Sequence, residues 1–149
     1  LIYYCGISFF KSSNPYEFYD LLNGIDMEPK QDVWGTLIFP ENAKLPCPVI
    51  VPIHGSAGLR EGHHTHMVNL LEAGFAVFRI HHFESRGVIS IVENQTQVTL
   101  ATMITDAFRA LALLNKHPDI DKNKIGIMGS TFFFNLLING VNSLFPVTE

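Results

Sequence analysis

The sequence predicts an α/β protein with a doubly wound, mostly parallel sheet. Three apolar runs of strand length, at residues 48–53, 75–80 and 125–128, alternate with segments of helical periodicity. Such continuous apolar runs are typical of strands that are covered on both faces, and their alternation with helices favours a parallel sheet between two helical layers. The chain has 149 residues, which suffices for one domain with a buried core.

The first part of the chain allows two interpretations. Residues 1–10 (LIYYCGISFF) have the length of the apolar region of a signal peptide, and they fit an N-terminal strand equally well. We therefore treat residues 1–13 as a signal-peptide remnant or an N-terminal strand, and residues 14–149 as a partial domain. A signal remnant would indicate a secreted or periplasmic protein, and a strand would fit a cytoplasmic one. Residues 14–28 are expected to form a loop with short extended pieces.

The remaining elements follow in order. Residues 33–39 are rich in β-formers and end at Pro40, and the polar turn at 41–46 suggests a hairpin with that strand. A helix is predicted over 61–73, with Gly74 as its stop. The longest predicted helix spans 96–115; its apolar face leaves Asp106 and Arg109 pointing outward.

Composition argues against several kinds of partner. The net charge is −4 and the pI is about 5.9, with lysines and arginines scattered along the chain, so neither nucleic acid nor an anionic membrane is an expected partner. No apolar run reaches the about 18 residues that a membrane-spanning helix requires. Cys5 and Cys47 are too few for a disulfide framework or a zinc knuckle, and we expect two unpaired, buried thiols.

Histidines gather in two places, which raises the question of a metal. His63, His64 and His66 precede or begin a predicted helix, and His81 and His82 follow a predicted strand. The spacing matches no known metal-ligand motif, so we interpret these side chains as polar loop residues that face a cleft. A metal-binding module remains a third alternative for the function.

The most informative stretch is a strand that turns sharply into an apolar helix at residues 124–134 (KIGIMGSTFFF). The turn at 129–132 should meet the loops at 54–56 and 80–86, because the carboxyl ends of parallel strands share one edge of the sheet. Ligands bind at that edge in open α/β sheets.

Three ordered segments carry a resemblance to a known family: VIVPIHGSAG (49–58), GFAVFRI (74–80) and DAFRALALLNKHPDIDKNKIGIMGST (106–131). With their spacing they resemble the N-terminal part of an α/β-hydrolase of the dienelactone hydrolase type, over residues 33–143. The resemblance implies an incomplete α/β-hydrolase fold that lacks the C-terminal strands. It also implies an esterase-like hydrolase that cleaves the acyl bond of a small ester or lactone through an acyl-enzyme, without metal or cofactor.

The same resemblance implies roles for individual residues. Thr131 occupies the nucleophile position of the elbow, and Ser130 is an alternative hydroxyl. The backbone N–H of Phe132 would be one oxyanion-hole donor, and the loop of Gly55 and Ser56 would supply the second, through the Ser56 N–H. Candidate substrate contacts are His54, which also positions its loop, His81, and Arg86, for which an exposed structural arginine is the alternative.

The sequence also departs from the family pattern. Gly129 fits the first glycine of the elbow, but Thr131 replaces the serine and Phe133 replaces the second glycine. In this fold the acid and the histidine follow the nucleophile, yet the residues after Thr131 include no histidine and a single acid, Glu149. The hydrolase interpretation, with this chain as a fragment, therefore has a rival: a non-catalytic, hydrolase-like module that binds small molecules.

Overall fold

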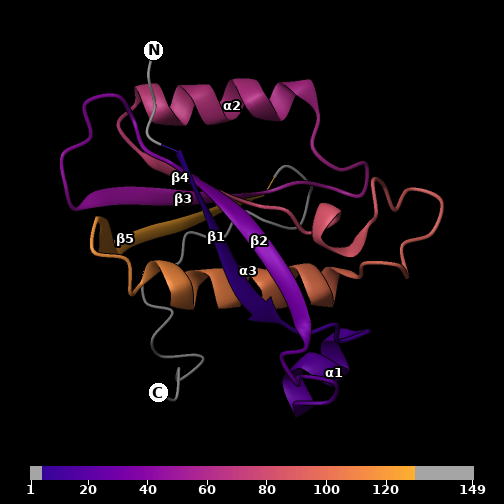
Figure 1. Ribbon diagram of the computed structural model, residues 1–149. Helices are drawn as coiled ribbons and strands as arrows, with labels where there is room; N and C mark the ends of the chain where they lie inside the picture. Colours follow the sequence, from indigo (N-terminus) through magenta and orange to yellow (C-terminus); the bar gives the residue numbers. More distant parts are fainter. Residues whose placement is uncertain (1–4, 130–149) are drawn as a thin grey trace.

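A computed structural model describes residues 5–129 and contains a five-stranded sheet with the strand order β1-β2-β4-β3-β5 (Figure 1). Two pairings are parallel, β3 with β4 and β3 with β5, and two are antiparallel, β1 with β2 and β2 with β4. The strands are β1 (Cys5–Ser12), β2 (Gln31–Ile38), β3 (Cys47–Ile53), β4 (Ala76–Ile80) and β5 (Ile120–Gly129).

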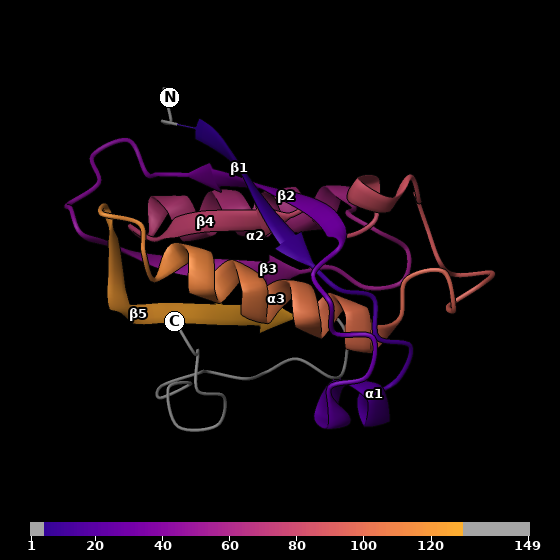
Figure 2. The same cartoon turned by 60° about the horizontal axis from the view of Figure 1, so that its bottom comes forward.

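Helices cover both faces of this sheet, as predicted. Helix α2 (Glu61–Glu72) lies on one face and helix α3 (Leu100–Leu114) lies on the other, and the two views agree on this layering (Figures 1 and 2). A short helix, α1 (Phe18–Asn23), and a 3₁₀ turn, η1 (Glu84–Arg86), complete the elements. The α/β architecture is thus confirmed, with a mixed sheet because β1 and β2 run antiparallel to their neighbours.

The main core lies between the sheet and α3. Buried side chains from β3 and β4 pack there against one stripe of the helix, and these include Val49, Val51, Phe78, Met103, Ala107 and Leu114. A smaller cluster beneath α2 consists of Met67, Leu71 and Val77. Alternate residues of β4 therefore serve opposite layers, which follows from the two-residue period of a strand.

One glycine of β2 has a packing role in this core. A Cβ atom on Gly35 would overlap the ring of Phe78, and that ring is fully buried. By contrast, a Cβ on Gly6 of β1 would meet no atom within 4 Å. Gly35 thus leaves room for the tip of the Phe78 ring to approach the neighbouring strand.

The predicted hairpin after β2 is wrong. Strand β2 pairs with β1 and β4, and β4 separates β2 from β3. After β3 the chain forms α2 and then returns to the sheet as β4, which lies between β2 and β3. The turn residues at 41–46 are therefore a connection between non-adjacent strands, which local sequence patterns do not distinguish from a hairpin.

Two local boundaries also differ from expectation. Residues 18–23 form α1 within the segment that we expected to be a loop; Asp20 Oδ2 accepts the N–H groups of Tyr16 and Glu17, each at 3.1 Å, and Gly24 ends the helix at φ 69°. Helix α3 begins at Leu100, four residues after the expected start, because Thr99 caps it by accepting the Thr102 N–H.

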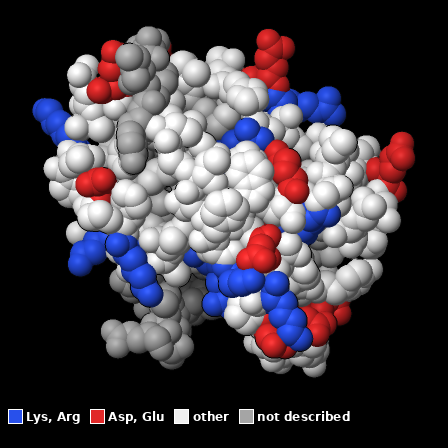
Figure 3. Space-filling view, viewed as in Figure 1, with Lys and Arg blue, Asp and Glu red and all other residues white. Residues whose placement is uncertain are grey.

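The surface shows no charged face of one sign in the view of Figure 3, where basic and acidic side chains are interspersed. Within residues 5–129, no helix is both long enough and apolar enough to cross a lipid bilayer. Both cysteines are unpaired; Cys47 is buried as expected, but Cys5 is exposed because it lies on the uncovered face of the edge strand β1.

Candidate functional site

The candidate site lies at the carboxyl ends of β3, β4 and β5. Ile53, the last residue of β3, pairs with Gly129, the last residue of β5. The start of the loop at His54 and the end of β5 therefore lie at the same level of two adjacent strands. Ser130, Thr131 and Phe132 themselves lie outside the described residues.

The loop of residues 54–58 is held by hydrogen bonds to two successive backbone carbonyls. The Gly55 carbonyl accepts the Gly58 N–H at 3.0 Å, and His54 Nδ1 lies 3.0 Å from the same oxygen. The Ser56 carbonyl accepts the Ile91 N–H at 2.8 Å and the Ser90 hydroxyl at 3.3 Å. This loop is thus anchored both to itself and to the segment that follows η1.

The anchoring also orients one backbone donor, the N–H of Ser56. In a trans peptide the carbonyl of Gly55 and the N–H of Ser56 point in opposite directions, so fixing the first orients the second. Within residues 5–129, the Ser56 N–H has no hydrogen-bond acceptor. A backbone donor held in place and left unpaired is the arrangement that stabilises a negative oxygen on a ligand.

The turn of this loop depends on Gly58. Its φ angle is +76°, in the left-handed region, and a Cβ atom there would lie 2.7 Å from the Ile89 carbonyl oxygen. Gly87, at φ +68°, shares the unusual backbone conformation, but its Cβ would meet nothing within 4 Å. Gly58 therefore combines a conformational requirement with a steric one.

His54 is a neutral anchor in this loop. Its side chain is buried against the rings of Phe83 and His82, at centroid distances of 4.5 Å and 5.6 Å. Burial lowers the His54 pKa to about 4, with a smaller contribution from the neighbouring His82 and opposed by the bond to the Gly55 carbonyl. At neutral pH the ring thus offers a directed hydrogen bond and no charge.

Behind His54 lies a buried polar network that the sequence did not reveal. Asp106, in the middle of α3, has no solvent exposure and accepts hydrogen bonds from three side chains. These are Ser12 Oγ at 2.5 Å, His82 Nδ1 at 2.8 Å, and the Arg86 guanidinium, which bonds both carboxylate oxygens at 2.8 and 2.9 Å. The expectation that Asp106 points outward is therefore wrong.

The carboxylate is ionised within this network. Burial alone would raise the pKa of Asp106, but the hydrogen bonds from His82 and Arg86, together with the positive charge of the guanidinium, lower it below its usual value. The bidentate guanidinium supplies the compensating positive charge. The end of β1 and the segment 82–86 cover this side of α3, so a helical pattern alone could not show that the position is buried.

Arg86 belongs to this network. Its side chain is 7% exposed, and besides Asp106 it bonds the His82 carbonyl at 2.9 Å and Asn14 Oδ1 at 2.8 Å. The expectation of an exposed arginine is therefore corrected, because the guanidinium is committed to a buried carboxylate. A direct substrate contact by Arg86 would require that it leave these partners.

His81 is buried on the other face of the sheet. Its ring stacks on Trp34, with a centroid distance of 3.4 Å, and its Nε2 lies 2.9 Å from the Thr36 hydroxyl. Burial and the charge of Arg79 lower the His81 pKa, although Glu84 opposes them. The two adjacent histidines thus point to different layers, and His82 is the one that reaches His54.

The described residues hold no group of three or more metal-ligating side chains placed to bind an ion. His63 Nδ1 instead accepts the Arg60 N–H at 2.9 Å, at the start of α2. The histidine cluster of α2 thus has at least one local structural role.

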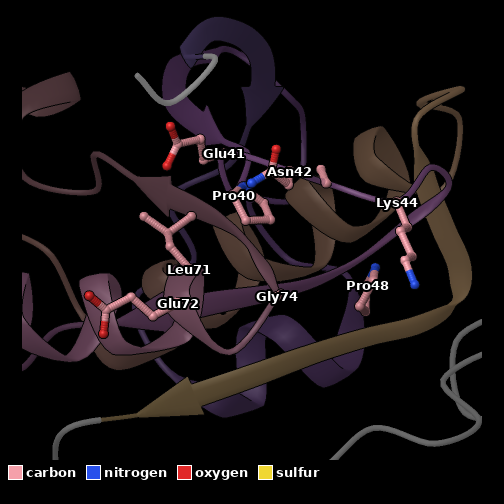
Figure 4. A pocket seen from close by; sticks show the side chains of 9 residues that line it. Pro40, Glu41, Asn42, Lys44, Pro48, Leu71, Glu72 and Gly74 are labelled. Carbon is pink, nitrogen blue, oxygen red and sulfur yellow. The ribbon is translucent and has the colours of Figure 1, made fainter. Parts of the chain in front are cut away.

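A separate pocket of about 500 Å³ lies near the amino end of β3, away from the carboxyl ends that form the candidate site (Figure 4). It is bounded by the 40–44 segment, the start of β3 and the end of α2, and Glu41, Lys44 and Glu72 are its charged residues. None of its lining residues belongs to the 54–58 loop or to the network around Asp106. The hollow therefore has no part in the candidate site.

No protein-family model matches the chain, and no curated protein sequence matches it. Solved structures do match. Carboxyl esterase 2 of the fungus Tuber melanosporum has a TM-score of 0.57 and 18% identity, and the match covers 85% of this chain and 36% of the esterase. A Klebsiella pneumoniae protein assigned as a dienelactone hydrolase has a TM-score of 0.55 and 15% identity, with 83% of this chain and 50% of that protein covered.

A third structure, Est1E from Butyrivibrio proteoclasticus with ferulic acid bound, has a TM-score of 0.52 and 23% identity, over 66% of this chain and 38% of Est1E. The chain spans half or less of the length of these three proteins. Likeness at such identities establishes architecture and leaves activity open. Over the residues that the structure describes, the chain has the α/β-hydrolase fold.

Proposed function

We propose that this chain provides the oxyanion loop and the nucleophile position of a hydrolase that acts on small carboxylic esters or lactones. The observation that carries the proposal is the pairing of Ile53 with Gly129, which puts the start of the 54–58 loop beside the end of β5, the strand that leads to residues 130–132. In this fold those two segments face each other across the bound acyl group. The esterase and hydrolase assignments of the similar structures agree with the substrate class.

The proposed chemistry follows from these positions. The hydroxyl of Thr131, or of Ser130, attacks the ester carbonyl carbon, and the carbonyl oxygen becomes an oxyanion. The N–H of Ser56 and the N–H of Phe132 donate to that oxygen. The tetrahedral intermediate then collapses, the alcohol leaves with a proton, and water releases the acid from the acyl-enzyme. Each oxyanion donor of this kind contributes on the order of 100-fold to 1,000-fold in rate.

No general base is assigned among the described residues. His54 and His82 are buried and bound to other groups, and the sequence after Thr131 contains no histidine. A hydroxyl without a neighbouring base is a poor nucleophile, so we expect slow turnover from the residues of this chain alone.

The lack of an assigned general base favours a second candidate, a binding module of the hydrolase fold. Its site would keep the donor of the 54–58 loop and bind the carbonyl or carboxylate of a small molecule without cleaving it. The threonine at position 131 and the phenylalanine at position 133 motivate this candidate, because side chains of this size would crowd an elbow of the kind that presents a nucleophile.

Steady-state hydrolysis of p-nitrophenyl acetate by the purified chain tests the proposal. We expect turnover above the buffer rate, reduced in Thr131→Ala or Ser130→Ala and abolished when both are combined. Circular dichroism of each variant controls for folding. Turnover that survives the double substitution would remove the nucleophile assignment.

Calorimetric titration with acetate and with phenyl acetate separates the two candidates. Binding of either ligand without turnover in the unmodified chain supports the binding module. Turnover rules the module out. If the chain shows no binding and no turnover, both candidates are contradicted.

A further inference from the structure

We propose that His82 and Asp106 are positioning residues that hold the 54–58 loop through the ring of His54. The inference rests on the proposed function for its purpose, since the loop is the one assigned to the oxyanion. The contacts that hold the loop involve described residues alone, and they can be tested without a substrate.

The first step is the cost of the network. Asp106 and His82 have no solvent exposure, and the charged Arg86 is nearly as buried. Placing charges in the interior carries a desolvation penalty, and apolar residues of similar size often stabilise a fold as well or better. A buried carboxylate with three side-chain partners therefore suggests a requirement for defined geometry.

The second step is the orientation of His82. Asp106 Oδ2 accepts from His82 Nδ1 at 2.8 Å, which assigns the ring proton to Nδ1 and fixes the plane of the imidazole. The Nε2 atom is buried, and no partner for it is found among the described residues. The carboxylate therefore holds the ring through Nδ1, and the Nε2 side of the ring has no hydrogen bond to a described residue.

The third step is the contact with His54. The two imidazole rings meet at 84°, with their centroids 5.6 Å apart, which is the edge-to-face arrangement that ring pairs favour. Phe83 packs against His54 at 68°, so consecutive side chains of the segment after β4 contact the same ring. His54 therefore has little freedom to rotate.

The fourth step connects this ring to the loop. His54 Nδ1 lies 3.0 Å from the Gly55 carbonyl, and that carbonyl belongs to the same peptide bond as the Ser56 N–H. Rotation of the His54 ring would leave the Gly58 N–H as the remaining donor to this carbonyl among the described residues and would loosen the hold on the peptide. Asp106 thus fixes His82, His82 confines His54, and His54 sets the direction of the proposed oxyanion donor.

The substitution His82→Asn separates positioning from simple stability. An asparagine amide can occupy the place of Nδ1 and still donate to Asp106, so the carboxylate keeps its partner while the ring that contacts His54 is lost. His82→Ala removes both. His81→Asn is the matched control, because the same change is made one residue away, in a ring that stacks on Trp34 instead of His54.

The measurement is amide hydrogen exchange by NMR at Gly58 and Ile91, whose N–H groups close the loop, with amides of β3 as the internal reference. In His82→Asn we expect exchange at both sites to accelerate by about threefold to tenfold relative to β3, as the loss of one ring contact implies. His81→Asn should leave the ratio unchanged. Wild-type protection in His82→Asn, or equal acceleration in His81→Asn, would overturn the inference.

Failure of the proposed function is distinguishable from failure of this inference. The exchange ratio needs no substrate and responds only to the hold on the loop. If the chain hydrolyses esters, His82→Asn should lower kcat with little change in KM, because a displaced oxyanion donor affects the transition state more than the bound ester. Unchanged kcat beside accelerated exchange would keep the positioning and reject the oxyanion role of the loop.

Discussion

His82 Nδ1 lies 2.8 Å from Asp106 Oδ2, and neither side chain is exposed to solvent. This hydrogen bond joins α3 to the segment after β4, and Arg86 forms an ion pair with the same carboxylate. Because the same segment contacts His54, the stability of the domain and the geometry of its candidate site depend on one buried carboxylate.

The substitution Asp106→Ala should destabilise the fold by about 3–5 kcal/mol, because it leaves the Arg86 charge buried without its partner. Urea denaturation followed by circular dichroism measures this. Asp32→Ala is the matched control: Asp32 pairs with Lys11 at the surface, and its side chain is 73% exposed. We expect that substitution to cost less than about 1 kcal/mol. Equal losses in the two variants would contradict the role given to the network.

Stability should fall as the pH decreases from 6.5 towards about 4, because burial lowers the His54 pKa from 6.5 to about 4. In that interval the unfolded chain binds a proton that the folded chain does not, which favours unfolding by up to about 3 kcal/mol at the lower end. His81, with its lowered pKa, adds a slope of the same sign.

The variant His54→Gln isolates the contribution of His54. Free energies of unfolding measured between pH 4 and 7 should show a shallower slope in the variant than in the wild type. An identical slope in both proteins would mean that His54 titrates normally and is not buried as described.

Gly58→Ala should disrupt the 54–58 loop more than Gly87→Ala does. Both positions have positive φ, so each alanine carries a conformational cost of about 1–2 kcal/mol. Only at Gly58 does the new Cβ collide with a backbone oxygen, that of Ile89, at 2.7 Å. Thermal unfolding and ester hydrolysis of the two variants check this, and equal effects on both readouts would argue against the steric role.

Gly35→Ala should destabilise the core, because its Cβ would overlap the fully buried Phe78 ring. Overpacking of this kind costs about 1–3 kcal/mol. Gly6→Ala, at a strand position with free space, should change the stability by less than about 0.5 kcal/mol. Chemical denaturation of both variants gives the comparison, and a neutral Gly35→Ala would show that Phe78 can move aside.

The sequence predicted the elements that determine the layering. The apolar runs at 48–53 and 75–80 correspond to β3 and β4, and the predicted helix at 61–73 corresponds to α2. Those patterns arise from burial, which acts on each segment separately. The pairing of strands does not arise that way: the hairpin expected after β2 failed because β4 returns between β2 and β3.

Of the candidate site, the sequence predicted the loop that follows β3 and missed the buried side chains behind it. The 54–58 loop follows from a strand that ends at a glycine-bearing turn. The buried position of Asp106 could not be derived, because Ser12, His82 and Arg86 reach it from three separate segments. The one available indication was a single acidic residue within a mostly apolar helix.

Covalent trapping tests the central claim most directly. The purified chain would be treated with an ethyl p-nitrophenyl alkylphosphonate, which transfers its phosphorus to a hydroxyl beside an oxyanion site and releases nitrophenolate. Peptide mapping by mass spectrometry would then locate the adduct. We expect a single adduct at Thr131 or Ser130 that is weakened by Gly58→Ala. Nitrophenyl ester hydrolysis without any adduct at these two residues would contradict the proposed nucleophile.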